Sequence, residues 1–395
     1  MKLERLGNYI KQIRGLSYKP NEIHDEYQEG RIAILKANNI QDNVLDDTDL
    51  IYIDKSKTKT EQKIKKGDIL IAASSGSKEI VGKNIYFRND YEAVFGAFCK
   101  VVRINEKVNS EFISHFFKTP IYKNHIRNSI QGANINNLKN EHIDELKLAI
   151  PSLEEQKHIA VVLSKAEALI AERKQSIQLL DEYLKSTFLE MFGDPVENTK
   201  NYVKTALSNL LEVRGRVGWK GYKKSDLRMS GPYVLGATHL THSGDIDLND
   251  PVYISREKFE ESPEIMVQIG DLLIVQRGNT IGKVGHVNIS INEATINPCI
   301  LILRPISINS FFLKHLFNNN KVQRVLWQMN TGSAQPMLTQ SQLRGMEIIS
   351  PPEKLQTQFA QIVEKTEVLK AQYKGHLQEL EQLYGALSQR AFRGG

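Results

Sequence analysis

The sequence predicts a mixed α/β (α+β) protein with two similar globular domains and two long helices that pair as an antiparallel coiled coil. Three observations support this fold class: an internal repeat, alternating strand-like and helix-like runs inside each copy, and a heptad pattern at the end of each copy. We expect globular domains at residues 1–150 and 196–350, a central spacer helix at 151–195 and a C-terminal spacer helix at 351–395. The repeat implies a pseudo-twofold relation between the two halves.

The repeat appears when residues 1–195 are placed on residues 201–395, an offset of 200. The matching positions are mostly glycines, cysteines and prolines with their neighbours: Arg14-Gly15 with Arg214-Gly215, Val81-Gly82-Lys83 with Ile281-Gly282-Lys283, Cys99 with Cys299, Gly132 with Gly332, and Pro151 and Gln156 with Pro351 and Gln356. Solenoid units are about 20–50 residues long, so this longer period indicates two whole domains. The chain therefore presents two similar surfaces.

Each globular copy combines strand-like runs with helical patterning. In the first copy we expect strands at 31–35, 50–53, 68–72, 83–87 and 98–104, and a helix over 110–129. In the second copy we expect strands near Tyr233, Val252, Leu272, Lys283 and Leu301, and a helix over 310–329.

After each copy, apolar residues follow alternating steps of four and three residues. In the first copy they are Ile159, Leu163, Ala166, Ile170, Ile177, Leu180, Leu184 and Met191, and in the second Phe359, Val363, Thr366, Leu377, Leu380, Tyr384, Leu387 and Ala391. Lys370 and Tyr373 interrupt the second series. A helix with one such seam needs a partner, and we expect the two helices to pair in antiparallel order. The alternative is that each helix packs only on its own domain.

The bulk composition is that of a water-soluble globular protein, and the net charge of +6 is mild. No apolar run approaches the roughly 18–20 residues that span a bilayer, and Met1-Lys2-Leu3-Glu4-Arg5 carries no apolar signal core. We therefore expect a cytoplasmic protein. Both cysteines lie in apolar runs, so we expect them to be buried strand residues in a reducing compartment.

The residue types that carry catalysis do not form a convincing set. The stretch Gly278-Asn279-Thr280-Ile281-Gly282-Lys283-Val284 is one residue short of a P-loop and lacks the following Ser or Thr. Neither histidines nor cysteines cluster at the spacing of metal ligands, and no glycine-rich S-adenosylmethionine loop is visible. We therefore expect neither catalytic residues nor a metal site, and a role in recognition or assembly.

Two loops follow the Gly-Asp segments at Asp68 and Asp271 and carry hydrogen-bonding side chains beside glycines. Their candidate contact residues are Ser74, Ser75, Ser77 and Lys78 in the first copy, and Gln276, Arg277, Asn279, Thr280 and Lys283 in the second. Glycine lets such a loop approach a ligand backbone closely. An ordinary hairpin turn is the alternative interpretation.

A second candidate surface is basic. Its residues are Arg214, Arg216, Lys220, Lys223 and Lys224, with Trp219 and Tyr222 interleaved, and its weaker counterpart in the first copy is Arg14 and Lys19. Arginines mixed with aromatics and glycines suit contacts with phosphates. The lysine run at 55–66 is equally well explained as a solvated loop.

The order of these motifs resembles a known family. Each copy has a Gly-Asp-Ile-Leu type strand, then a Gly-Ala-Asn or Gly-Ser-Ala-Gln-Pro loop, then a Pro-x-x-x-x-Gln-x-x-Ile-Ala type helix. The helices close in Phe188-Leu189-Glu190-Met191-Phe192-Gly193-Asp194-Pro195 and in Gln389-Arg390-Ala391-Phe392-Arg393-Gly394. Over essentially the whole chain this resembles the DNA specificity subunit of type I restriction-modification systems. The two helix starts, Pro151-Ser152-Leu153 and Pro351-Pro352-Glu353, differ, so partner contacts there need not be equal.

The resemblance implies that each globular domain is a target recognition domain that reads one half of a bipartite site on double-stranded DNA. It implies that the helices act as the spacer and dock methyltransferase (modification) subunits, which we expect to be two. Restriction/translocase subunits would join in the full complex, and S-adenosylmethionine and ATP would bind only to partner subunits.

Two other interpretations stay open at the level of sequence. One is a coiled-coil scaffold that joins two protein-binding domains, against which the basic, aromatic-bearing segments count. The other is a diverged DNA methyltransferase or nuclease, against which the missing cofactor and metal sets count.

Overall fold

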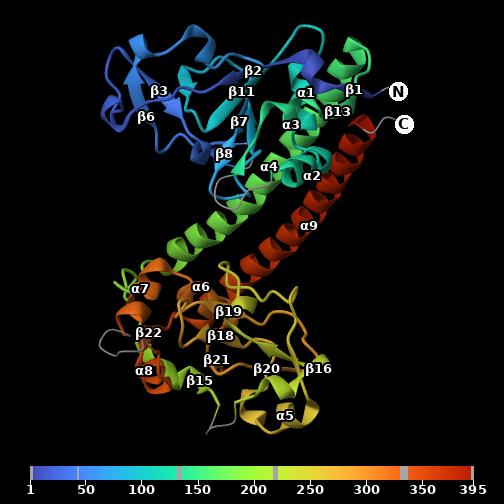
Figure 1. Cartoon of the computed structure of the whole chain (residues 1–395). Helices are drawn as coiled ribbons and strands as arrows, with labels where there is room; N and C mark the ends of the chain where they lie inside the picture. The colour runs from blue at the N-terminus through green and yellow to red at the C-terminus, as the bar shows by residue number, and fades with distance from the viewer. Residues whose placement is uncertain (1–2, 42–43, 131–135, 217–220, 330–336, 393–395) are drawn as a thin grey trace. The chain divides into compact units, whose positions relative to one another are not determined.

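The computed structural model describes residues 3–41, 44–130, 136–216, 221–329 and 337–392 (Figure 1). The chain forms two compact units, one of Met1–Arg173 with His376–Gly395 and one of Lys174–Gly375. We call them unit 1 and unit 2. Each unit therefore contains one globular domain, one part of the central helix and one part of the C-terminal helix.

The two units share one sheet plan. In unit 1 the strands are β1 (Leu3–Arg5), β2 (Ile10–Arg14), β3 (Arg31–Leu35), β4 (Ile40–Gln41), β5 (Val44–Leu45), β6 (Ile51–Asp54), β7 (Ile69–Ala72), β8 (Ser74–Ser75), β9 (Asn84–Tyr86), β10 (Ala93–Phe95), β11 (Cys99–Ile104), β12 (Asn136–Asn137) and β13 (Lys147–Ala149). In unit 2 they are β14 (Lys204–Ala206), β15 (Leu211–Arg214), β16 (Leu227–Leu235), β17 (Tyr253–Ile254), β18 (Leu272–Val275), β19 (Val284–His286), β20 (Ala294–Ile296), β21 (Ile300–Pro305) and β22 (Glu347–Ile349). The antiparallel sheet β2-β11-β7-β9 of unit 1 corresponds to β15-β21-β18-β19 of unit 2. A second sheet, β10-β3-β6, corresponds to β20-β16-β17, and in both the first pair of strands is parallel.

The predicted strands of the first copy are confirmed to within one or two residues, but the predicted helices at 110–129 and 310–329 are wrong. Each is two helices: α1 (Ser110–Phe116) and α2 (Pro120–Ser129), and α6 (Ser310–Phe317) and α7 (Asn320–Gln328). Pro120 has no N–H to continue a helix, and the extended Thr119 accepts a hydrogen bond from the N–H of Tyr122. The short helices α3 (Asn140–Asp144), α5 (Arg256–Glu260) and α8 (Gln340–Gly345) complete the domains.

The Gly-Asp motif has the same structural role in both units. Asp68 is 1% exposed and accepts two hydrogen bonds from the Arg103 guanidinium, at 2.8 and 2.7 Å. Asp271 is equally buried and accepts two from Arg304, both at 2.8 Å. Such bidentate pairs fix geometry as well as charge. The motif therefore anchors the central strand of each sheet to its neighbour.

A second anchor ties each domain to the helix that follows it. Gln156 accepts a hydrogen bond from the N–H of Asn109 at 2.8 Å and donates one to the carbonyl of Pro151 at 2.8 Å. Gln356 makes the equivalent bonds to Asn309 at 2.9 Å and Pro351 at 2.7 Å. Both glutamines are buried, so these bonds satisfy backbone groups that water cannot reach.

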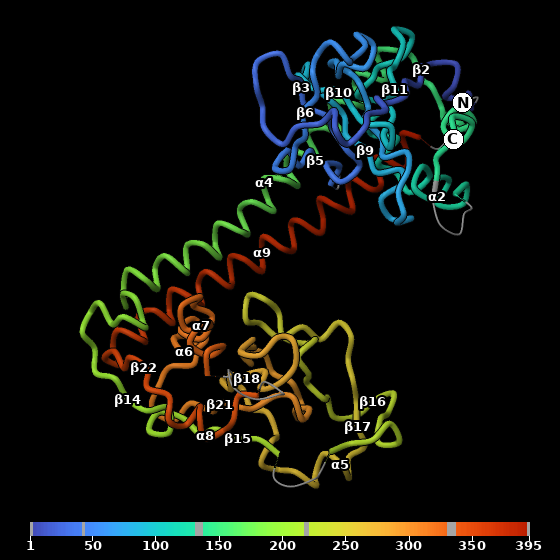
Figure 2. Tube along the Cα trace, turned by 60° about the vertical axis from the view of Figure 1, so that its left-hand side comes forward, coloured from blue at the N-terminus to red at the C-terminus, as the bar shows by residue number. Residues whose placement is uncertain are grey.

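The long helices are α4 (Leu153–Phe192) and α9 (Glu353–Phe392), each of 40 residues and continuous in Figure 2. In unit 1 the Tyr384 hydroxyl donates to Glu167 at 2.9 Å, and in unit 2 the Lys370 ammonium donates to Asp181 at 2.5 Å. Glu167 precedes Asp181 along α4, whereas its partner Tyr384 follows Lys370, the partner of Asp181, along α9. The helices pair in antiparallel order in both units, which confirms the predicted coiled coil.

Lys370, which interrupts the apolar series of the second copy, is buried in the structure. Its side chain is 4% exposed within the seam and lies 3.8 Å from Glu367 as well as against Asp181. Burial opposes the charge of Lys370, but its hydrogen bond to Asp181 and the nearby carboxylates hold its pKa above the ordinary value.

Each long helix ends in the hydrophobic core of the unit that it enters last. Phe192 of α4 is buried in unit 2, with its ring centroid 4.8 Å from that of Phe312 and 5.4 Å from that of Phe359. Phe392 of α9 is buried in unit 1, 4.9 Å from the ring centroid of Phe112. The alternative in which each helix packs only on its own domain is therefore not what the structure shows.

Cys99 opens β11 and is buried, and burial raises the pKa of its thiol to about 12. Cys299 was also expected to be a buried strand residue, but it precedes β21 and is only half-buried. Both thiols are free. None of the described helices is long and apolar enough to cross a membrane.

We predict that Phe192→Ala lowers the free energy of unfolding of unit 2 by about 3–5 kcal/mol, because it removes a ring from the core. Urea unfolding followed by tryptophan fluorescence measures this change, since both tryptophans, Trp219 and Trp327, belong to the second repeat. Leu189→Ala, at a position 46% exposed on the same helix, is the control. A destabilisation by Phe192→Ala no larger than that of the control would contradict the anchoring role.

Candidate nucleic-acid interface

In unit 1 the loop after the Gly-Asp strand is a tight, internally bonded turn. Ser74 and Ser75 form β8 and pair with Asn137 and Asn136 of β12. The Ser75 hydroxyl accepts from the N–H of Ser77 at 3.2 Å. Ser77 and Lys78 are exposed at the tip. The structure thus supports the hairpin-like geometry and leaves the tip accessible to a ligand.

The corresponding loop of unit 2 divides into an anchored residue and an exposed tip. Gln276 is half-buried, and its side chain donates to the carbonyl of Pro298 at 2.8 Å. Arg277, Asn279 and Thr280 are exposed, and Gly278 between them has a φ of +104°. Lys283 lies at the far end of the turn and reaches the carbonyl of Ala237 at 3.5 Å. The tip residues, rather than Gln276 or Lys283, can reach a ligand without first breaking a bond.

A Cβ at either matching glycine of the repeat would crowd its surroundings. At Gly82 a Cβ would lie 2.8 Å from Ile126, and at Gly282 it would lie 2.9 Å from Gln323. Both glycines also have a φ near +90° (+89° and +85°). These glycines therefore hold the base of each loop against α2 or α7.

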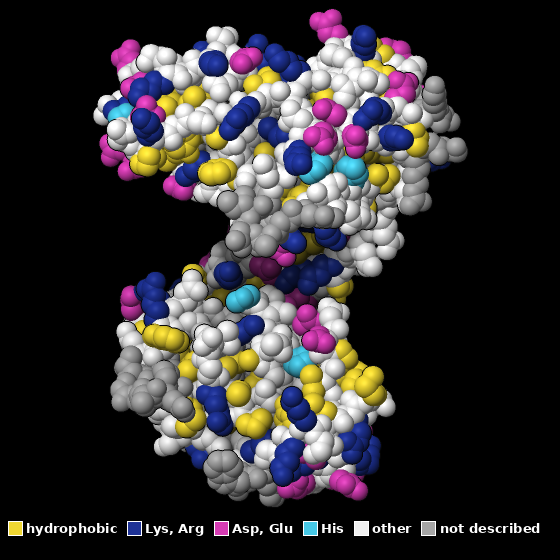
Figure 3. Space-filling view, viewed as in Figure 1, with side chains coloured by type: hydrophobic (Ala, Val, Ile, Leu, Met, Phe, Trp, Pro, Cys, Tyr) yellow, Lys and Arg dark blue, Asp and Glu magenta, His cyan; other side chains and the backbone are white. Residues whose placement is uncertain are grey.

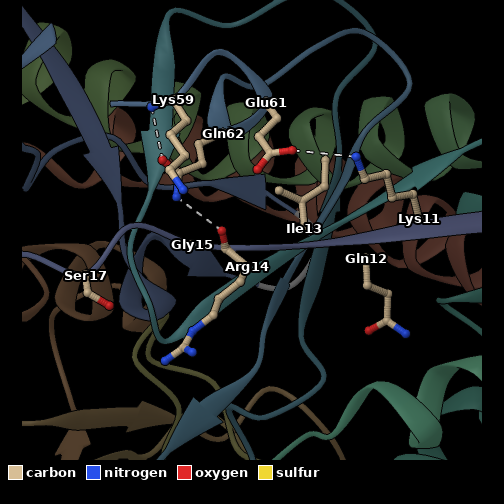
Figure 4. A pocket seen from close by; sticks show the side chains of 9 residues that line it. All are labelled: Lys11, Gln12, Ile13, Arg14, Gly15, Ser17, Lys59, Glu61 and Gln62. Carbon is tan, nitrogen blue, oxygen red and sulfur yellow. Dashed lines mark hydrogen bonds and ion pairs between the residues drawn. The ribbon is translucent and has the colours of Figure 1, made fainter. Parts of the chain in front are cut away.

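Arg14 lies at the end of β2, and its side chain is exposed between two cavities. The first has a volume of about 350 Å³ and is lined by Lys11, Gln12, Ile13, Arg14, Gly15, Ser17, Lys59, Glu61 and Gln62. Figure 4 shows the Arg14 guanidinium extending away from the Lys11–Glu61 ion pair, while its carbonyl accepts a hydrogen bond from Gln62 at 3.3 Å. Lys19 lines neither cavity and begins the 3-10 turn Pro20–Glu22.

The second cavity, of about 470 Å³, brings Arg14 together with Ser74 of the predicted loop. None of its other lining residues was a predicted contact residue: Gln12, Ile13, Ala73, Ala97, Phe98, Cys99, Lys100, Asn137, Leu138, Lys139 and Asn140. Phe98 was assigned to a strand, but it precedes β11 and is 65% exposed. The sequence did not reveal that the Phe98 side chain is exposed, because Phe98 continues the strand-like run to Ile104 and periodicity does not mark where a strand begins.

The basic cluster of unit 2 also divides into residues that are bonded to the protein and residues that are exposed. Arg214 pairs with Glu212. Arg216 is half-buried, donates to the carbonyl of Ile296 at 3.2 Å and lies 5.9 Å from the ring centroid of Tyr222. Burial lowers the pKa of Arg216. Lys223 and Lys224 are exposed, and Lys220 lies outside the described residues.

Charges of both signs are interspersed on the face of each unit that Figure 3 shows. In the 55–66 run, Lys55 pairs with Glu92 at 2.7 Å and Lys57 with Glu22 at 2.9 Å. These two lysines therefore fit the solvated-loop interpretation. Among the residues that the structure describes, no group of three or more His, Cys, Asp or Glu could hold a metal ion.

Comparison with known proteins identifies the repeat. Residues 4–181 and 200–382 each match the type I restriction modification DNA specificity domain. The chain is 28% identical over 404 residues to the type I restriction enzyme StySPI specificity subunit of Salmonella potsdam, covering 97% of this chain and 86% of that protein. It is also 28% identical over 401 residues to the EcoKI specificity subunit of Escherichia coli K12, with the same coverage.

The fold agrees with a solved structure. The crystal structure of the type I restriction-modification S subunit from M. genitalium superposes with a TM-score of 0.62 at 15% identity, covering all of this chain and 96% of that one. Since the family match extends over both repeats, the chain belongs to the type I restriction-modification DNA specificity family.

Proposed function

We propose that this chain is the specificity subunit of a type I restriction-modification complex and that each unit reads one half of a bipartite DNA site. The observation that carries this proposal is the specificity domain occurring twice, at 4–181 and 200–382. Two copies that differ in their loops suit two different half-sites. The chain itself is not the enzyme. S-adenosylmethionine and ATP would bind to partner subunits, which carry the methylation and cleavage chemistry.

The scaffold and diverged-enzyme interpretations are not favoured, because the relatives along almost the whole chain are specificity subunits. A gel shift with the purified chain, with and without a methyltransferase partner, tests the proposal. Binding restricted to DNA of one bipartite sequence supports it. Equal binding to all sequences, with the partner present, would reject it.

The exposed loop tips are the proposed DNA contacts. In unit 2 these are Arg277, Asn279 and Thr280, and in unit 1 Ser77 and Lys78. Arginine is the residue best suited to guanine, whose O6 and N7 accept two hydrogen bonds in the major groove. Lys223 and Lys224 are proposed to hold phosphates, which position the protein without reading sequence.

The helix pair offers two related apolar patches for partner subunits. On one side of the helix pair, Ala160 and Phe188 of α4 are buried in the cores of unit 1 and unit 2, and Ala360 of α9 is also buried. On the other side of the helix pair, four apolar residues that directly precede the heptad positions along the sequence are exposed. They are Leu169 (50%) and Leu383 (52%) in unit 1, and Tyr183 (51%) and Leu369 (36%) in unit 2.

The antiparallel register puts Leu169 and Leu383 on the same side of the helix pair, since Glu167 and Tyr384 are in contact beside them. Tyr183 and Leu369 are related in the same way through Asp181 and Lys370. The two patches are related by the repeat, because Leu169 corresponds to Leu369 and Tyr183 to Leu383 at the sequence offset of 200. Two equivalent patches favour two copies of one partner, and we propose that these are the modification subunits. Restriction subunits would then join the assembled complex.

We predict that Leu169→Glu removes one modification subunit from the complex and that Leu169→Glu with Tyr183→Glu removes both. A buried carboxylate in place of an apolar contact costs enough to weaken each interface more than tenfold. Native mass spectrometry of the purified complex gives the stoichiometry. Val161→Glu and Leu189→Glu, exposed positions facing away from the seam, are matched controls. Retention of both subunits by the double variant, or an equal loss from the two controls, would contradict the assignment.

We predict that Arg277→Ala weakens binding by about 1–3 kcal/mol and relaxes specificity at one position of one half-site. Mapping methylated sites across a genome reads this change directly. Arg256→Ala, an exposed arginine of unit 2 that pairs with Glu293, should leave the site unchanged. Unchanged affinity and an unchanged site for Arg277→Ala would reject base contact.

We predict that Lys223→Gln with Lys224→Gln lowers the salt dependence of DNA binding by roughly 0.9 log unit for each phosphate that is no longer neutralised, with no change of target sequence. Binding isotherms at several salt concentrations measure the slope. Lys354→Gln, exposed at the start of α9, serves as the control. If the slope is the same in all three proteins, the two lysines are only solvated.

A further inference from the structure

The cavity in unit 1 beside Arg14 and Ser74 differs in charge from four other cavities of the described residues. Three cations line it, Arg14, Lys100 and Lys139, and its described lining residues include no carboxylate. By contrast, each of these four cavities carries at least one, for example Glu61 in the cavity of Figure 4 and Glu212 in the cavity beside Arg214. A concave site with cations and no acid attracts an anionic ligand.

The floor of this cavity is held by a closed network of hydrogen bonds. The Lys100 ammonium donates to Gln12 at 3.1 Å and to Asn140 at 2.7 Å. The Gln12 amide in turn donates to the carbonyl of Asn140 at 2.9 Å and to Asp144 at 2.8 Å. Burial lowers the pKa of Lys100 to about 8, so the group remains largely charged at neutral pH. The network joins β2, β11 and α3 and makes the floor rigid.

Phe98 stands at the rim of this floor with its backbone fixed. Its carbonyl accepts hydrogen bonds from the N–H groups of Ala73 at 2.8 Å and Ser74 at 3.0 Å. Its ring is nevertheless 65% exposed. A large apolar side chain exposed on a rigid turn, among cations and amides, adds little to a core and is suited to contact a ligand.

Unit 2 lacks this combination. The strand pairing shifts the equivalence by one residue here, so Phe98 corresponds to Cys299 and Lys100 to Leu301, while Asn137 corresponds to Met337. The carbonyl of Cys299 is still used as an anchor, since it accepts a hydrogen bond from the N–H of Gln276 at 2.8 Å. The backbone frame is therefore shared, while the side chains that face outward differ. This is the pattern expected where two domains of one fold read different sequences.

We propose that Phe98 is a specificity-determining residue that makes apolar contact with the 5-methyl group of a thymine in the half-site read by unit 1. This proposal rests on the proposed function. The ring offers no hydrogen bond, and the methyl group of thymine is the apolar group that the base edges present in the major groove. Arg14 and Lys139 at the same rim hold the neighbouring phosphates. Lys100 acts through Gln12 and Asn140 and positions the rim.

The test uses the full complex of this chain with its modification subunits. Genome-wide mapping of methylation first defines the bipartite site of the wild-type complex, and the half-site that Arg277→Ala leaves unchanged is assigned to unit 1. Duplexes are then made with deoxyuridine in place of each thymine of that half-site. Deoxyuridine lacks only the methyl group, so pairing and hydrogen bonding are preserved.

One deoxyuridine should weaken wild-type binding about fourfold, which corresponds to about 0.8 kcal/mol for one buried methyl group. Phe98→Ala should bind the thymine and deoxyuridine duplexes equally and accept cytosine at that position. Phe98→Leu should keep part of the preference for thymine. Tyr27→Ala, an aromatic residue of unit 1 that is 64% exposed and lines no described cavity, should behave as wild type.

Other outcomes overturn the inference. If deoxyuridine has no effect on the wild-type complex, or if the half-site contains no A·T pair, Phe98 does not read a methyl group. If fluorescence of 2-aminopurine in the half-site rises on binding and falls with Phe98→Ala, the ring is inserted between bases instead. If the complex with Phe98→Ala lacks a modification subunit but keeps its site, the ring contacts protein. A wild-type complex with no bipartite site would instead reject the proposed function itself.

Discussion

The antiparallel pairing of α4 with α9 is the constraint on which the rest of the structure depends. A 40-residue helix with a single apolar seam is not stable alone, so each helix needs the other along its length. The contacts of Tyr384 with Glu167 and of Lys370 with Asp181 show the same register in both units. Because Phe192 and Phe392 end in the two cores, neither domain can pack fully without the end of the helix that began in the other unit.

Around this helix pair the two domains keep their anchors and change their surfaces. The Asp68–Arg103 and Asp271–Arg304 pairs, and the bonds of Gln156 and Gln356, are repeated almost unchanged. The rim residues are not repeated, since Phe98 and Lys100 are replaced by Cys299 and Leu301. A fixed frame with exchangeable rim side chains explains how one fold can serve two different half-sites.

Much of the fold was predictable because periodicity and the repeat report local structure directly. The strand at Arg31–Leu35 and both long helices follow from apolar spacing. The break at Pro120 was missed because the apolar spacing continues across it, although the proline itself cannot continue the hydrogen-bond ladder. The candidate site was less predictable. Arg216 packs against Tyr222 and Lys370 meets Asp181 only through tertiary contacts, and Phe98 is exposed only because β11 begins after it.

The proposed function implies that the helix pair acts as a spacer that sets the distance between two DNA half-sites. It is tested most directly by inserting four residues into α4 after Ser176 together with four into α9 after Lys374, the facing position in the antiparallel register. Four residues lengthen a helix by about 6 Å, which is close to two base pairs at about 3.4 Å each. Mapping of methylated sites should show both half-sites unchanged and the gap between them longer by about two base pairs. An unchanged gap, or changed half-site bases, would contradict the claim.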